Sequence, residues 1–113
     1  MHETGLAQEI IEILQDVMCE HQNQRLLTAH IDVGELVAVM PESLHLAYEA
    51  LTSDTALQNS KLQLHILPIL SCCRSCKKEF NVTSFQFACP HCGSTELVVL
   101  SGNEFQITAI EIE

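Results

Sequence analysis

The sequence lacks tryptophan and has few other aromatic side chains. Four phenylalanines and one tyrosine are present in 113 residues, although 47% of the residues are hydrophobic. A core must therefore be built mainly from Leu, Ile, Val and Ala, and the composition is that of a globular protein rather than a disordered one. The length suits one ordinary domain, or one domain that carries a small metal-stabilised module.

Basic residues are also scarce, and this limits the classes of partner. Five Lys and Arg residues stand against fifteen Asp and Glu residues, which gives a formal net charge of -10. Such a charge repels the phosphates of nucleic acids and the surface of an anionic membrane. We therefore expect neither nucleic acid nor a membrane as a partner.

The sequence has no apolar run long enough to cross a bilayer and no pattern of an export signal. The run Leu62–Leu70 is short and contains His65 and Pro68, whereas a membrane-spanning helix needs about 20 apolar residues. The first residues include His2 and Glu3, whereas a secretory signal begins with basic residues and continues with an apolar stretch. We expect a cytoplasmic protein.

Hydrophobic periodicity predicts two helices and three strands. Apolar residues at helical spacing predict one helix from Leu6 to near His21, and a second from Pro41 to about Asp54. Apolar and polar residues alternate over 27–33, 62–66 and 105–112, which predicts strands. The alternation changes phase between residues 107 and 110, as a bulge would cause.

These elements predict an α+β fold with two helices on a three-stranded sheet and an inserted module, which the cysteine spacing described below identifies as a zinc ribbon. Residues 1–70 and 101–113 would form one discontinuous domain. Residues 71–100, which lie between the second and third predicted strands, would form the inserted module.

Four of the six cysteines lie in two close pairs. Cys73-x-x-Cys76 and Cys89-x-x-Cys92 are separated by twelve residues, so a hairpin between them would bring four thiolates to one ion. Zinc prefers such tetrahedral sites, and four thiolates leave no coordination position for a substrate. We expect a structural zinc rather than a rubredoxin-like iron or a secreted disulfide framework. Cys72 adds a competing thiol, but the two-residue gap favours Cys73.

Two further residues near these patterns have simple interpretations. Cys19 follows apolar Met18 at the end of the first predicted helix, so we expect it to be a buried and unreactive thiol. His91 lies inside the second cysteine pair, and we expect a solvated loop residue there rather than a ligand.

The amino terminus, Met1-His2-Glu3, offers donors for a metal ion. The α-amine of Met1, the imidazole of His2 and the backbone nitrogen between them can form fused chelate rings. Nitrogen donors of this kind suit nickel or copper, and Glu3 would supply an oxygen or orient His2. A histidine at position 2 is, however, usually only a mobile surface residue.

The chain as a whole closely resembles the hydrogenase nickel-incorporation proteins known as HypA and HybF. The resemblance covers nearly the whole length. The motifs that carry it are Met1-His2-Glu3 with Leu6-Ala7, Val33-Gly34-Glu35-Leu36, Pro41-Glu42-Ser43-Leu44, and the pairs Cys73/Cys76 and Cys89-Pro90/Cys92-Gly93-Ser94.

This resemblance implies a nickel metallochaperone, not an enzyme, that acts in maturation of nickel-iron hydrogenase and, in some members, of urease. It implies a nickel site at His2 with backbone nitrogens and Glu3. It implies a structural zinc on Cys73, Cys76, Cys89 and Cys92. The expected partners are a HypB-type GTPase, the nickel-iron hydrogenase large subunit and, in some members, urease maturation proteins.

Two other classes of function compete with this hypothesis. A zinc-ribbon nucleic-acid-binding or interaction module would use Phe80, Phe85 and Phe87 as an aromatic face, but the chain lacks the basic charge for it. A metal enzyme would use His2 with other histidines at an open site. The remaining candidates, His30, His45 and His65, show no i, i+4 spacing, so ordinary surface or core histidines account for them better.

Overall fold

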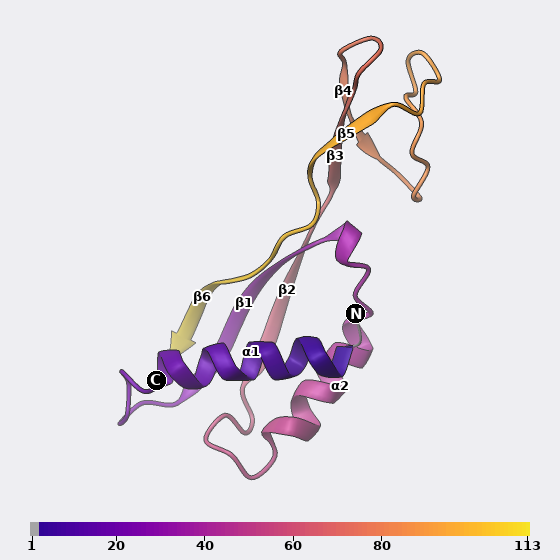
Figure 1. The fold of residues 1–113 in the computed structure, drawn as a ribbon. Helices are drawn as coiled ribbons and strands as arrows, with labels where there is room; N and C mark the ends of the chain where they lie inside the picture. Colours follow the sequence, from indigo (N-terminus) through magenta and orange to yellow (C-terminus); the bar gives the residue numbers. More distant parts are fainter. Residues whose placement is uncertain (1–2) are drawn as a thin grey trace. The chain divides into compact units, whose positions relative to one another are not determined.

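A computed structural model describes residues 3–113, which form two α-helices, a short 3-10 helix and two three-stranded sheets (Figure 1). The elements are α1 (Glu3–Met18), β1 (Leu26–Gly34), η1 (Glu35–Val37), α2 (Pro41–Thr52), β2 (Lys61–Leu67), β3 (Ile69–Cys73), β4 (Glu79–Val82), β5 (Leu97–Ser101) and β6 (Phe105–Ile112). The predicted α+β class is confirmed, and so are the two predicted helices and three strands.

The chain divides into two compact units. The first comprises the residues up to Asp32 together with Val39–His65 and Gln106–Glu113, and the second comprises Val33–Ala38 and Ile66–Phe105. The domain boundaries expected from the sequence, 1–70 with 101–113 and 71–100, stay a prediction.

The first unit has helices packed on a sheet with strand order β2-β1-β6. Figure 1 shows α1 lying across the strands, and α1 also packs against α2. Helical spacing and strand alternation together place one apolar face of each element inside. The fully buried core side chains of this unit include Leu6, Ile10, Leu14, Leu26, Ala29, Ile31 and Leu44.

Some side chains of this unit depart from the predicted burial. Ile13, Leu27 and Leu51 are 37–44% exposed. Cys19 was expected to be buried, and this prediction is wrong: the thiol is exposed. The helix ends at Met18, so Cys19 lies in the turn that follows and no longer on the buried stripe.

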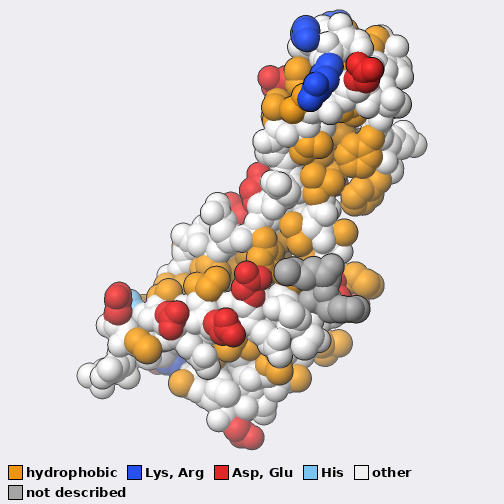
Figure 2. All heavy atoms as spheres, viewed as in Figure 1, with side chains coloured by type: hydrophobic (Ala, Val, Ile, Leu, Met, Phe, Trp, Pro, Cys, Tyr) orange, Lys and Arg blue, Asp and Glu red, His pale blue; other side chains and the backbone are white. Residues whose placement is uncertain are grey.

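The second unit has a sheet in which β3 lies between β4 and β5 and is antiparallel to both. Alternate residues of β3, namely Ile69, Ser71 and Cys73, are buried. Large apolar side chains also remain at its surface, and Figure 2 shows such side chains gathered on this unit. They include Phe85, Phe87, Val98, Val99 and Leu100.

Two glycines lie where the end of β1 meets the loop between β5 and β6. The Gly34 N–H donates to the Glu104 carbonyl (2.7 Å), and the Leu36 N–H donates to the Gly102 carbonyl (2.8 Å). A Cβ on Gly34 would overlap the backbone of Gly102, so only glycine fits this approach. Gly34 therefore allows a close backbone contact at this point.

Neither helix of residues 3–113 has the length and apolar character that a membrane span needs.

Candidate metal centre

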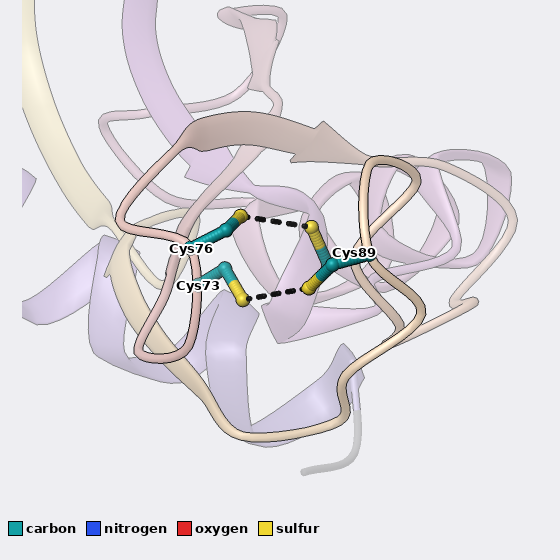
Figure 3. A group of neighbouring side chains, drawn as sticks. Cys73, Cys76 and Cys89 are labelled. Atoms are coloured by element: carbon teal, nitrogen blue, oxygen red, sulfur yellow. Dashed lines mark hydrogen bonds between the residues drawn. The ribbon is translucent and has the colours of Figure 1, made fainter.

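The four paired cysteines come together at one point in the second unit. One sulfur from each of Cys73, Cys76, Cys89 and Cys92 lies within 4.8 Å of all the others. Figure 3 shows the Cys73 and Cys76 side chains facing the loop that carries Cys89. The two pairs therefore meet as expected, but the predicted hairpin between them is wrong. Residues 77–88 contain only the strand β4, which pairs with β3, so the turn that carries Cys73 and Cys76 is itself the turn of the hairpin.

Cys73 and Cys76 lie in a tight turn at the end of β3, which we call the first knuckle (residues 73–78). The Cys73 carbonyl accepts a hydrogen bond from the Lys77 N–H, and the Cys73 N–H donates to the Lys78 carbonyl, both at 2.9 Å. Lys77 adopts a left-handed conformation with φ of 67°. These bonds fold the backbone around the two sulfurs.

Cys89 and Cys92 lie in an equivalent turn, the second knuckle (residues 89–94). The Cys89 carbonyl accepts from the Gly93 N–H, and the Cys89 N–H donates to the Ser94 carbonyl, both at 2.8 Å. Gly93 is left-handed with φ of 78°. The hydrogen bonds and the left-handed residue occupy the same positions, counted from the first cysteine, as in the first knuckle. The sequence signals this at Gly93, but nothing signals it at Lys77.

The separations between the sulfurs fit a tetrahedral ion. The Cys73 and Cys92 sulfurs are 3.6 Å apart, and so are the Cys76 and Cys89 sulfurs (dashed in Figure 3). Metal–sulfur bonds of about 2.3 Å would place tetrahedral ligands about 3.8 Å apart. Four soft sulfur donors at this spacing suit zinc or an iron–sulfur type of centre.

The backbone of the first knuckle polarises one sulfur of the Cys73–Cys92 contact. The N–H of Cys76 lowers the pKa of Cys73 to about 6, against the opposing effect of burial and with help from the Ser75 N–H. At Cys92 the Ser94 N–H lowers the pKa, but the Cys73 sulfur, burial and the other two sulfurs raise it to about 12. Within this contact, the Cys73 sulfur therefore carries negative charge more readily than the Cys92 sulfur.

In the contact between Cys76 and Cys89, the pKa is again lowered at the first cysteine of a pair and raised at the second cysteine of the other pair. At Cys89 burial raises the pKa, but the N–H groups of His91 and Cys92 and the neighbouring sulfurs lower it further, so that the net shift is downward. At Cys76 the Lys78 N–H lowers the pKa, but burial and the Cys89 sulfur outweigh it. A metal ion that binds all four sulfurs must displace the remaining thiol protons.

Cys72 and His91 lie beside this cluster. Cys72 precedes Cys73 on β3, so the alternation of a strand turns its side chain to the other face, and its thiol contacts the Cys73 carbonyl at 3.7 Å. His91 is exposed, and its backbone N–H lies 3.4 Å from the Cys89 sulfur. The converging set contains Cys73 rather than Cys72.

The predicted nickel ligands are only partly within the structure. Met1 and His2 lie outside the described residues 3–113. Glu3 is half-buried at the start of α1, and its carboxylate accepts a hydrogen bond from the Met40 N–H at 3.1 Å. Met40 directly precedes α2, and no pattern in the sequence pointed to its backbone as a partner of Glu3.

Comparison with known proteins gives one consistent family. Residues 1–112 match the family model described as hydrogenase/urease nickel incorporation, metallochaperone, hypA. A protein of Solidesulfovibrio magneticus named hydrogenase maturation factor HypA is 36% identical over 118 residues, with all of both chains covered. A protein of the same name from Geobacter metallireducens is 34% identical over 115 residues, again with both chains fully covered.

Two solved structures share the fold. The solution structure of the Ni metallochaperone HypA from Helicobacter pylori has a TM-score of 0.66 at 18% identity, and the match covers 98% of this chain and 97% of that one. A second solution structure of HypA protein has a TM-score of 0.70 at 18% identity, with 100% and 97% covered. At this identity the similarity concerns the fold alone.

Proposed function

Because the chain belongs to the HypA family of hydrogenase and urease nickel-incorporation metallochaperones, we propose that it binds Ni(II) at its amino terminus and delivers the ion during maturation of nickel-iron hydrogenase. Members of this family are metallochaperones and not enzymes. The activity to be explained is therefore the binding and release of a metal ion rather than a chemical conversion.

The nickel ligands in this proposal are the Met1 α-amine, the backbone nitrogen and imidazole of His2, and Glu3. The observation that supports a site there is the hydrogen bond between the Glu3 carboxylate and the Met40 N–H. It fixes the carboxylate between the start of α1 and the start of α2, so that an oxygen donor is ordered in advance. Since two residues reach at most about 7 Å, an ion held by Met1 and His2 would be bound close to this carboxylate.

A site of this kind can release its ion because protons compete for the same donors. An α-amine and an imidazole have reference pKa values of about 7.7–8.0 and about 6.5, so they exchange a metal for a proton near neutral pH. The four-cysteine cluster, in contrast, offers no open position once its shell is closed.

The nickel site can be tested by blocking the α-amine without changing any side chain. A variant with a short extension before Met1 converts this amine into an amide, and a matched variant carries the same extension after Glu113. Calorimetric titration with Ni(II) should show a large loss of affinity for the first variant only. Equal affinity in both variants would exclude the amine as a ligand.

We propose a structural zinc on Cys73, Cys76, Cys89 and Cys92. The convergence of the four sulfurs, the two matching knuckles and the 3.6 Å contacts support tetrahedral coordination. Zinc would hold the two knuckles together in a unit whose hydrophobic core is small. Cys73→Ala should therefore lose the zinc and the ordered structure of the second unit, whereas Cys72→Ala should retain both.

The remaining parts of the proposal concern partners and location. The proposed partners are a HypB-type GTPase, the nickel-iron hydrogenase large subunit and urease maturation proteins, all in the cytoplasm. The proposed nickel domain is residues 1–70 with 101–113, and the proposed zinc domain is residues 71–100. Copurification of the zinc-loaded chain with the GTPase, compared with His2→Ala, would test whether recognition needs the nickel site.

A further inference from the structure

Three neighbouring strands of the first unit bring two histidines and a carboxylate together. His65 comes from β2, His30 from β1 and Glu111 from β6, in the order of the strands in the sheet. On β1 the flanking residues Ala29 and Ile31 are fully buried, so His30 points to the opposite face of the sheet. No sequence pattern indicates this cluster, because the two histidines are 35 residues apart.

The contacts within the cluster are short and directed. His30 Nε2 lies 2.8 Å from the Glu111 carboxylate, and His30 Nδ1 lies 3.1 Å from His65 Nε2. The two rings are tilted by only 13°, with their centroids 5.4 Å apart. That centroid separation is close to the nitrogen separation plus the two ring radii, so the rings meet edge to edge, nitrogen against nitrogen.

Glu111 determines which nitrogen of His30 carries the proton. An ionised carboxylate only accepts hydrogen bonds, so His30 Nε2 is the N–H, and in the neutral ring His30 Nδ1 then carries the lone pair. A carboxylate that holds the far nitrogen of an imidazole in this way is the usual arrangement behind a metal-binding histidine. His30 is thus oriented and in the tautomer that a cation requires, with its side chain 27% exposed.

We propose that His30 Nδ1 and His65 Nε2 form a second metal site, which takes a divalent ion with a preference for imidazole, such as Ni(II). Two nitrogens bound at about 2.1 Å in adjacent positions lie about 3.0–3.4 Å apart, and the observed separation is 3.1 Å. Imidazole is a suitable donor for nickel, copper and zinc. Glu111 is a positioning residue in this proposal rather than a ligand.

Binding needs only small changes of the two rings. In the metal-free pair, the lone pair of His30 Nδ1 accepts the His65 Nε2 proton. When the ion enters, His65 moves its proton to Nδ1, and the exposed His65 ring tilts so that both lone pairs point at the ion. The proton count of the pair is unchanged. Water would fill the other coordination positions, so the site is open and weaker than a four-ligand site.

The surrounding charge favours a cation at this face. Glu111 is directly part of the cluster, and Asp32 follows His30 two residues later on the same face of β1. The whole chain carries a formal net charge of -10, which raises the local concentration of cations.

The test uses untagged, zinc-loaded full-length protein and Ni(II) as the probe. In the His2→Ala background, calorimetry should show a weak nickel-binding event. Adding His65→Ala should lower its affinity at least about tenfold, and adding Glu111→Gln should lower it about tenfold through loss of ring orientation. His65 is exposed, so its removal should leave the fold intact. His21→Ala, at a histidine that contacts Gln24, is the matched control and should change nothing.

Magnetic resonance of the histidine rings shows which histidines bind Ni(II) in the weak binding event. Signals of His30 and His65 should broaden first as Ni(II) is added, while those of His45 stay sharp. An event that survives His65→Ala unchanged, or the absence of any weak event in His2→Ala, would overturn the second site. A tight event that survives His2→Ala alone would contradict the amino-terminal nickel site and leave the second site standing.

Discussion

Two single substitutions at the left-handed residues of the knuckles, Gly93→Ala and Lys77→Gly, should change zinc affinity in opposite directions. Gly93 and Lys77 occupy equivalent positions, with φ of 78° and 67°. A Cβ on Gly93 would meet no atom within 4 Å, so Gly93→Ala introduces no clash and only the backbone conformation costs energy. Lys77 already bears that cost, which Lys77→Gly removes.

The size of the effect follows from two opposing contributions. An L-residue in the left-handed region costs about 1–2 kcal/mol, and glycine-to-alanine replacement recovers about 0.4–1 kcal/mol by restricting the unfolded chain. The difference is about 1 kcal/mol, or about fivefold in an equilibrium constant. Because metal binding and folding of such a module are coupled, zinc affinity should fall about fivefold in Gly93→Ala and rise about fivefold in Lys77→Gly.

Competition with a zinc-selective chelator measures both changes. Lys77→Gln serves as the control, since it removes the positive charge near the thiolates and keeps the Cβ. Lys77→Gly should bind zinc more tightly than Lys77→Gln. Weaker zinc binding in Lys77→Gly than in Lys77→Gln, or unchanged binding in Gly93→Ala, would refute the equivalence of the two knuckles.

Three other perturbations have defined outcomes. Gly34→Ala should cost at least about 3 kcal/mol in thermal unfolding, because its Cβ would overlap the backbone of Gly102; Gly5→Ala, where a Cβ meets no atom within 4 Å, is the tolerated control. Burial raises the pKa of Tyr48 above 10.0, although its hydrogen bond to Ser60 opposes this. The folded state thus favours the protonated phenol, so stability should fall as pH rises past about 10, and Tyr48→Phe should lose that part of the pH dependence. Nickel affinity should decline on acidification from pH 8 to 6, because protons compete for amine and imidazole nitrogens; calorimetry showing equal affinity at both pH values would contradict nitrogen ligation.

Periodicity predicted the main elements because each has one strongly apolar face. Strand β6 is an informative case: residues 107 and 110 are half-buried while Thr108 and Ala109 between them are exposed, which matches the predicted change of phase. Local pattern was less informative at the edges of these faces. The alternation over residues 27–33 predicts that Leu27 is buried together with Ala29 and Ile31. In the structure Leu27 is 37% exposed, and its neighbour Leu26 is buried instead.

Contacts between distant residues escaped prediction for a physical reason. The pairing of His30 with His65 depends on which strands are neighbours, and that order is set by the whole fold rather than by either strand. The same holds for Glu3 and Met40, which are 37 residues apart and meet through a backbone N–H that any residue except proline carries. The cysteine cluster was predictable because two short Cys-x-x-Cys spacings each bring two sulfurs together, although the pairing of β4 and β5 with β3 that joins the two turns was not predicted.

The most direct test of the central claim is calorimetric titration of Ni(II) into the untagged, zinc-loaded chain and its His2→Ala variant at the same pH. The two proteins should have equal zinc content and equal thermal stability, because residue 2 has no role in the four-cysteine cluster. The native chain should show a tight nickel-binding event that His2→Ala lacks. Nickel binding by His2→Ala with native affinity and stoichiometry would contradict an amino-terminal nickel site.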